Sequence, residues 1–150
     1  MRVLAAIMFG LCLAGLMACS NAKPPAGRWE GAYDGPGVMV AVRLQIDGDG
    51  SIYLSAPDAI DFPTPSEEQR TAMHERLSAE LANAWGDVTA RHYDFDGHTF
   101  RKPGGIAPQM EWDAATKQMT AIVYLERRPG IRIPIHAVSE FTDNPWSTTS

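Results

Sequence analysis

The chain has 150 residues, of which 45% are hydrophobic and 21% charged, a size and composition that favour a single folded domain. Its 18 acidic residues exceed its 13 basic residues and leave a formal net charge of −5. Nucleic-acid binding draws on clustered cations, yet the only adjacent basic pairs are Arg101-Lys102 and Arg127-Arg128. The composition therefore argues against a nucleic-acid partner.

Residues 1–18 have the pattern of an export signal. Arg2 supplies a positive charge, and the apolar stretch from Val3 to Leu13 is shorter than the roughly 20 residues that a membrane-spanning helix needs. The stretch ends in Leu16-Met17-Ala18-Cys19, which resembles the lipobox of bacterial lipoproteins. This resemblance implies cleavage before Cys19 and attachment of acyl chains, palmitate among them, to that residue.

The residue after Cys19 bears on the location of the protein. Ser20 stands where the signal for inner-membrane retention usually carries Asp, so the resemblance implies the inner leaflet of the outer membrane, facing the periplasm. The membrane, reached through the acyl chains, is then a partner. The alternative is an ordinary secretory peptide cut after Ala18, which leaves Cys19 free.

The mature chain is predicted to have three parts. Residues 19–27 are small, polar and Pro-containing and are expected to form a lipidated tether. Residues 28–141 carry the alternating patterns of a β-barrel domain, and residues 142–150 are expected to be a flexible tail.

The strand signals begin with a strict alternation. Residues 38–46 alternate between an apolar face, formed by Val38, Val40, Val42, Leu44 and Ile46, and a face expected to meet solvent. A three-residue loop at 48–50, with Gly50 in a left-handed conformation, would set Ile46 opposite Ile52. Further strands are expected from about Val88 onward, and Pro134 is expected to place the last strand at an edge or seam.

One helix interrupts the strands, at about 66–85. Ser66 and Gln69 have the spacing of a capping box, and Gly86 follows the helix. Apolar residues recur at helical spacing at Met73, Leu77, Leu81 and Trp85. This helix is expected to cover one end of the barrel.

An aromatic hairpin is predicted after the helix. An Asp96-Gly97 turn would pair Phe95 with His98 and Tyr93 with Phe100, which builds an aromatic inner face. The outer face would then hold four polar residues, His92, Asp94, Thr99 and Arg101.

These elements predict a mainly β protein. About eight antiparallel strands in a meander favour a lipocalin-like barrel, with a β-sandwich as the alternative and the helix inserted between strands three and four. The opening Gly27-Arg28-Trp29-Glu30-Gly31 and the segment Ser55-Ala56-Pro57-Asp58 resemble small bacterial lipocalin-like domains. The helix departs from the loop usual in that family, which puts a shared ligand in doubt.

The residues give little support to metal binding or catalysis. A calcium loop starting at Asp47 would need Gly where Ile52 stands, and the Asp96-Gly97 turn breaks the row of polar residues from His92 to His98. Glu111 and Asp113 are paired carboxylates of the kind that can cleave glycosides, but such a pair usually lies on the solvent-exposed face of a strand. We therefore expect no enzyme activity, no cofactor and no metal, with a hydrolase as the least favoured alternative.

Aromatic residues are the candidates for a ligand site. They would line a cavity or fill the core of a small barrel, and they are Trp29, Tyr33, Tyr93, Phe95, Phe100 and Trp112. Two functions stay open: a binding module that holds a small apolar ligand or serves envelope maintenance, and an interaction protein such as a periplasmic enzyme inhibitor or accessory subunit. An open cavity favours the first, and an exposed apolar patch favours the second.

Overall fold

The computed structural model describes residues 22–148 except 57–59, 62–63, 105–108 and 126–128. The leader 1–18 and Cys19 lie outside the described residues, so the signal peptide and its acylation stay predictions. Within the described ranges, no helix has the length and hydropathy needed to cross a membrane.

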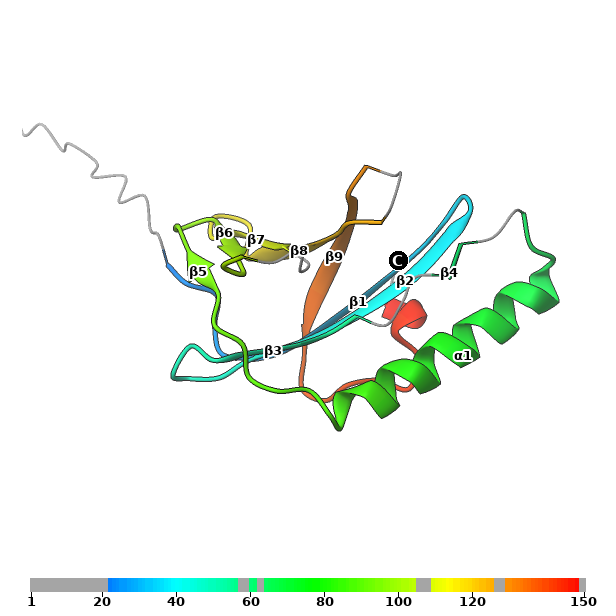
Figure 1. Cartoon of the computed structure of the whole chain (residues 1–150), viewed down its shortest axis with the longest axis horizontal. Helices are drawn as coiled ribbons and strands as arrows, with labels where there is room; N and C mark the ends of the chain where they lie inside the picture. Colours follow the sequence, from blue (N-terminus) through cyan, green and yellow to red (C-terminus); the bar gives the residue numbers. More distant parts are fainter. Residues whose placement is uncertain (1–21, 57–59, 62–63, 105–108, 126–128, 149–150) are drawn as a thin grey trace, which may run out of the picture.

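The fold is one curled antiparallel sheet (Figure 1). Eight strands follow the path β3-β2-β1-β9-β8-β7-β6-β5, and the short β4 pairs with β2. Among the described residues, the two ends of the path approach each other at one bridge, between Ile52 of β3 and Arg91, which precedes β5. The strands are β1 (Gly27–Gly35), β2 (Val38–Ile46), β3 (Ile52–Ser55), β4 (Ile60–Asp61), β5 (Asp94–Phe95), β6 (Thr99–Arg101), β7 (Gln109–Asp113), β8 (Gln118–Val123) and β9 (Ile131–Val138).

This architecture confirms the predicted mainly β, barrel-like fold with one helix. Helix α1 (Glu67–Trp85) follows β3 and the short β4 and precedes β5, so in chain order it comes after the third of the eight strands in the path and before the fourth. The turn from β2 to β3 is also as predicted, because Ile46 lies opposite Ile52 and Gly50 has a φ of 88°. A glycine suits this position because L-residues with a side chain rarely adopt positive φ.

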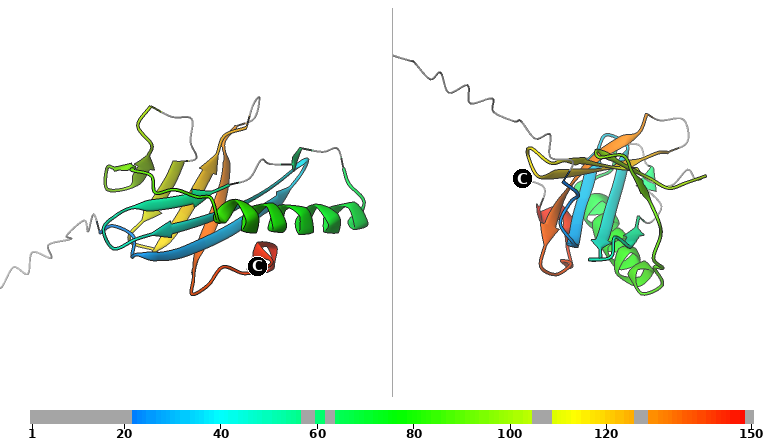
Figure 2. Two further views of the ribbon diagram at one scale, coloured as in Figure 1. Left: turned by 60° about the horizontal axis from the view of Figure 1, so that its bottom comes forward. Right: turned by 90° about the vertical axis from the view of Figure 1, so that its left-hand side faces the viewer.

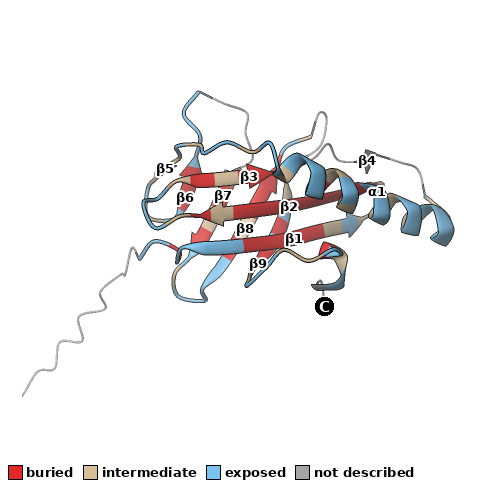
Figure 3. Ribbon diagram, turned by 90° about the horizontal axis from the view of Figure 1, so that it is seen from below, coloured by how far each residue is buried: buried red, intermediate tan, exposed pale blue. Residues whose placement is uncertain are grey.

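Strand β2 is buried on both faces, whereas the alternation predicted one solvated face (Figure 3). Val40, Val42 and Leu44 point into the interior cluster. The other face is covered because Met39 packs with Leu77 of α1, and Ala41 packs with Leu81. The prediction was wrong for this face because its cover comes from elements distant in the sequence.

Helix α1 begins as predicted. The Ser66 hydroxyl accepts from the backbone N–H of Gln69, whose side chain in turn accepts from the backbone N–H of Ser66. The helix runs along the outer face of the sheet beside β2 (Figure 2), so the expectation that it covers an end of the barrel was wrong. Burial of Leu77 and Leu81 against β1 and β2 accounts for this position.

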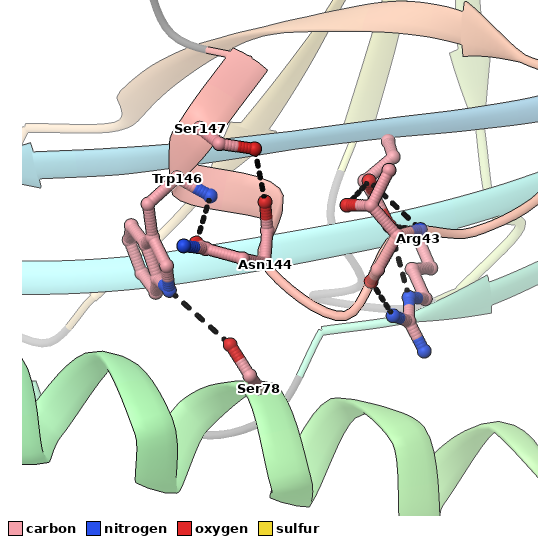
Figure 4. A network of polar contacts seen from close by, with 7 residues as sticks. Arg43, Ser78, Asn144, Trp146 and Ser147 are labelled. Atoms are coloured by element: carbon pink, nitrogen blue, oxygen red, sulfur yellow. Dashed lines mark hydrogen bonds and ion pairs between the residues drawn. The ribbon is translucent and has the colours of Figure 1, made fainter.

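Residues 142–148 pack on the domain, in contrast to the predicted flexible tail. The backbone N–H of Thr142 donates to the Glu30 carboxylate, and the short helix η1 (Pro145–Thr148) follows. Trp146 lies over α1, where its indole Nε1 donates to the Ser78 hydroxyl at 3.3 Å (Figure 4). Trp146 fills the space between α1 and the sheet. The polar sequence around Trp146 gives no sign of this role.

The aromatic hairpin has a different register from the predicted one. Phe95 pairs with Phe100 and Asp94 with Arg101, so the turn is centred on Gly97 and His98. The reason is that the Asp96 carboxylate accepts from the backbone N–H groups of His98 and Thr99, at 3.0 and 2.7 Å.

This shift preserves the two faces, because paired residues still share a side of the ribbon. Tyr93 and Phe95 pack on the interior cluster, whereas His92, Asp94 and Arg101 are exposed. Thr99 is the exception: it was predicted to face solvent but is buried beside β7.

Pro134 was predicted to lie at an edge or a seam; β9 is a central strand, so the edge was wrong, and Pro134 lies at the seam where β9 pairs with β8 but not with β1. Pro134 pairs with Thr120 of β8, whereas β1 pairs with β9 only at His136–Val138. The missing N–H of Pro134 therefore interrupts no ladder between β1 and β9. Gly31 of β1 permits the close crossing, since a Cβ there would lie 2.3 Å from the Pro134 carbonyl oxygen.

Candidate functional site

A segment that we call the strap, residues 22–26, lies across the end of the half-barrel where β1 begins, which we call the mouth. The Trp112 indole Nε1 donates to the Ala22 carbonyl at 2.7 Å, and Pro24 is buried. The sequence predicted a free tether over 19–27, so its described part instead docks on the domain. Two prolines in the strap lower the conformational entropy that docking costs.

A pocket of about 740 Å³ opens at the mouth beside the strap. Its floor contains the buried side chains of Trp29, Trp112, Met119 and Ile135. The sheet separates at this place, because β9 pairs with β8 up to Ile135 and with β1 only from His136 onward. The pocket therefore reaches the interior cluster through the place where β9 changes its partner strand.

The indole N–H groups of the two tryptophans in the floor differ in their partners. The Trp29 and Trp112 rings pack edge to face, with centroids 5.8 Å apart. The Trp112 Nε1 bonds to the strap, whereas Trp29 Nε1 is buried and has no hydrogen-bond partner among the described residues. A buried donor without an acceptor costs about 1–3 kcal/mol, and its burial closes Trp29 Nε1 to a ligand in the pocket.

A smaller pocket of about 260 Å³ lies on the other side of the strap, bounded by Lys23, Pro24, Tyr93 and Phe100. The Tyr93 hydroxyl is buried and also unpartnered among the described residues. Burial raises the pKa of Tyr93 above its ordinary value because the phenolate is poorly solvated there, although nearby Arg91 opposes the shift. Tyr93 therefore stays protonated at neutral pH, with its hydroxyl buried near the strap.

The six aromatic residues predicted as cavity or core lining gather in one interior cluster. Trp29, Phe100 and Trp112 are buried in it, and Tyr33, Tyr93 and Phe95 pack against it. Trp29 and Trp112 reach the larger pocket, while Tyr93, Phe95 and Phe100 reach the smaller one. Tyr33 lines neither of these pockets. The interior is thus largely packed, and its aromatic residues open to pockets at the mouth.

The polar residues considered for metal binding or catalysis serve the fold. His98 Nδ1 lies 2.8 Å from the Trp112 carbonyl, and His92 is exposed on the hairpin. In the described part of the chain, no three His, Cys, Asp or Glu side chains gather as metal ligands. Glu111 accepts a hydrogen bond from Arg132, which lowers the pKa of Glu111 below its ordinary value. Asp113 accepts hydrogen bonds within the β7–β8 turn, and these lower its pKa.

A further pocket, of about 530 Å³, separates α1 from the segment around Phe141 and Asn144. Several of its polar groups hold the fold: Arg43 pairs with Glu30, and Ser78 accepts from Trp146 (Figure 4). His74 stacks on Trp146 and lies 2.9 Å from Asp34. The mouth, with a larger pocket that reaches the interior cluster, is the stronger candidate for a ligand site.

Sequence reasoning missed the contribution of Ala22, Lys23 and Lys117 to the mouth. Lys23 and Lys117 line the larger pocket from the strap and from the β7–β8 turn. Neither residue belongs to a periodic pattern, since Lys23 precedes β1 and Lys117 lies in the turn between β7 and β8. The Pro24-Pro25 pair was the available signal, because it indicates a segment that docks at low entropic cost.

Comparison with known proteins adds no relative. A scan against protein-family models, a search of curated proteins and a search of solved structures each found no match.

Proposed function

We propose that this protein is a lipid-anchored lipoprotein of the bacterial cell envelope, a non-enzymatic binding module that holds a small apolar ligand at the mouth of its barrel. The observation that carries the proposal is the pocket of about 740 Å³ between the strap and the interior cluster. Its size lies within the range of small-molecule sites, and apolar lining with a few polar groups is typical of them. Lys23 and Lys117 in the lining supply such polar groups.

The proposed anchor places this pocket close to a membrane. Leu16-Met17-Ala18-Cys19 resembles a lipobox, and Cys19 precedes Ala22 by three residues. Three residues span at most about 11 Å, so an acylated Cys19 would hold the mouth near the lipid surface. Three buried acyl chains would anchor the protein durably, and Ser20 favours the inner leaflet of the outer membrane, facing the periplasm.

The alternative function is an interaction protein, such as a periplasmic inhibitor or accessory subunit. Such a protein would present an exposed apolar patch on its helix or loops. The apolar residues Leu77 and Leu81 of α1 are instead buried against the sheet. Among the described residues, Tyr124 is the one large hydrophobic side chain that is exposed, at 46%. These observations favour the ligand-binding function.

Native mass spectrometry of the full chain extracted from bacterial membranes tests the proposal. We expect a lipidated species carrying a non-covalent small molecule, and we expect Cys19→Ser to leave the membrane fraction. Ala137→Trp adds bulk to the pocket lining and should abolish the non-covalent adduct. The control is Ala115→Trp, an exposed residue of the β7–β8 turn that does not line the pocket. An adduct retained equally in both variants would contradict the site.

A further inference from the structure

We infer that the ligand of the mouth pocket is an anionic single-chain amphiphile, a long-chain carboxylate, whose headgroup meets Lys23 and Lys117. This inference rests on the proposed function and names the chemical class of its ligand. Two independent features of the pocket support it: the sign of its charge and the conformation of one lysine.

The charge of the pocket is opposite to that of the chain. Among the described residues, the lining contains two lysines and no Asp or Glu, although the chain carries a formal net charge of −5. In the described part of the chain, neither Lys23 nor Lys117 forms an ion pair with a carboxylate. Two cations beside buried apolar residues favour a ligand with a negative headgroup and an apolar body, and they disfavour a cationic one.

The turn that holds Lys117 does not favour a lysine. Lys117 has a φ of 56°, and it is the only residue other than glycine with a positive φ among those described. Glycine or asparagine adopts this left-handed conformation at lower cost. The local backbone therefore gives no reason for a lysine at this position, whereas a charge at the pocket does.

The lysines and the apolar floor together favour a carboxylate headgroup on an apolar chain. A carboxylate accepts hydrogen bonds from ammonium groups without needing to donate one, and its chain can lie on the buried apolar residues of the floor. A hydrocarbon leaves the lysines without a counter-charge, and an alkylammonium ion would be repelled by them.

Photolabelling of the full chain in phosphatidylcholine nanodiscs tests this assignment. The two probes are a palmitic acid that carries a diazirine in its chain and a hexadecyltrimethylammonium ion with the same diazirine. Peptide mass spectrometry locates the labelled residues. We expect the carboxylate to label β7, β8 and β9 around the pocket about tenfold more than the ammonium ion, which corresponds to about 1.4 kcal/mol.

Two lysine variants separate a binding role from a structural one. Lys117→Gly relieves the left-handed backbone, so it should melt at the same temperature or higher while its labelling by the carboxylate falls severalfold. Lys23→Glu should show a similar fall because it places a negative charge on the strap. Lys102→Glu is the matched control, since Lys102 is exposed and lies outside the pocket, and its labelling should not change.

Each other outcome overturns a different part of the account. Equal labelling by both probes, or labelling unaffected by the two lysine variants, would overturn the carboxylate and leave an apolar site as proposed. Labelling seen only in Cys19→Ser would mean that the protein's own acyl chain fills the pocket, and this too would overturn the inference. No labelling of the pocket in either the wild type or Cys19→Ser would contradict the proposed function itself.

Discussion

Replacement of Glu30 by Leu is expected to lower the free energy of unfolding by about 3–5 kcal/mol. Glu30 and Arg43 are 1% and 5% exposed, and their Oε2 and Nε atoms lie 3.2 Å apart. The same carboxylate accepts from the backbone N–H and the hydroxyl of Thr142. Glu30→Leu would leave the guanidinium buried without its counter-charge, and it would also release the C-terminal segment.

The double variant Glu30→Leu/Arg43→Met is the control for this prediction. Because it removes both charges and keeps apolar volume, it should recover most of the stability that Glu30→Leu loses. Chemical denaturation of the three proteins measures the difference. A single variant as stable as the wild type would show that Arg43 finds water or another partner, and it would contradict the role assigned to this ion pair.

Truncation of Leu77 to Ala is expected to lower the free energy of unfolding by about 2–5 kcal/mol. Leu77 is fully buried between α1 and Met39 of β2, with Met73 and Trp146 beside it. The substitution removes three buried carbon atoms and leaves a cavity that a helix held at several points cannot close. Thermal or urea unfolding followed by circular dichroism measures this loss.

The neighbouring residue provides the matched control. Arg76→Ala removes an exposed side chain whose ion pair with Glu80 is an i, i+4 contact, so it should cost at most about 0.5 kcal/mol. If Leu77→Ala were as mild as Arg76→Ala, the helix would not depend on its packing against the sheet, and its place in the fold would have to be revised.

The elements that could be predicted are those with a strong local pattern. The strand at 38–46 with its inward apolar face, the loop at Gly50 and the capping box at Ser66 each correspond to the structure closely. Such features depend on neighbours in the sequence, where period and turn chemistry are informative. The inner aromatic face of the hairpin was predicted for the same reason, even though the turn is centred one residue later.

The features that could not be predicted depend on contacts between distant residues. Nothing local to Met39 or Ala41 shows that α1 and Trp146 cover them. The strap and the C-terminal segment are polar and lack a period, yet Pro24 and Thr142 attach them to the domain. For the candidate site this meant that the aromatic floor could be named from the sequence, but the lysines at its rim could not.

The indole environments provide the most direct test that the mouth is a ligand site. The four tryptophans are Trp29 and Trp112 in the pocket, and Trp85 and Trp146 near the C-terminal segment. Fluorine NMR of the full chain labelled with 5-fluorotryptophan resolves them once each has been assigned by substitution with Phe. On addition of dodecanoate below its micellar concentration, we expect the Trp29 and Trp112 resonances to shift and the other two to stay. Shifts confined to Trp85 and Trp146, or no shift at all, would contradict a ligand site at the mouth.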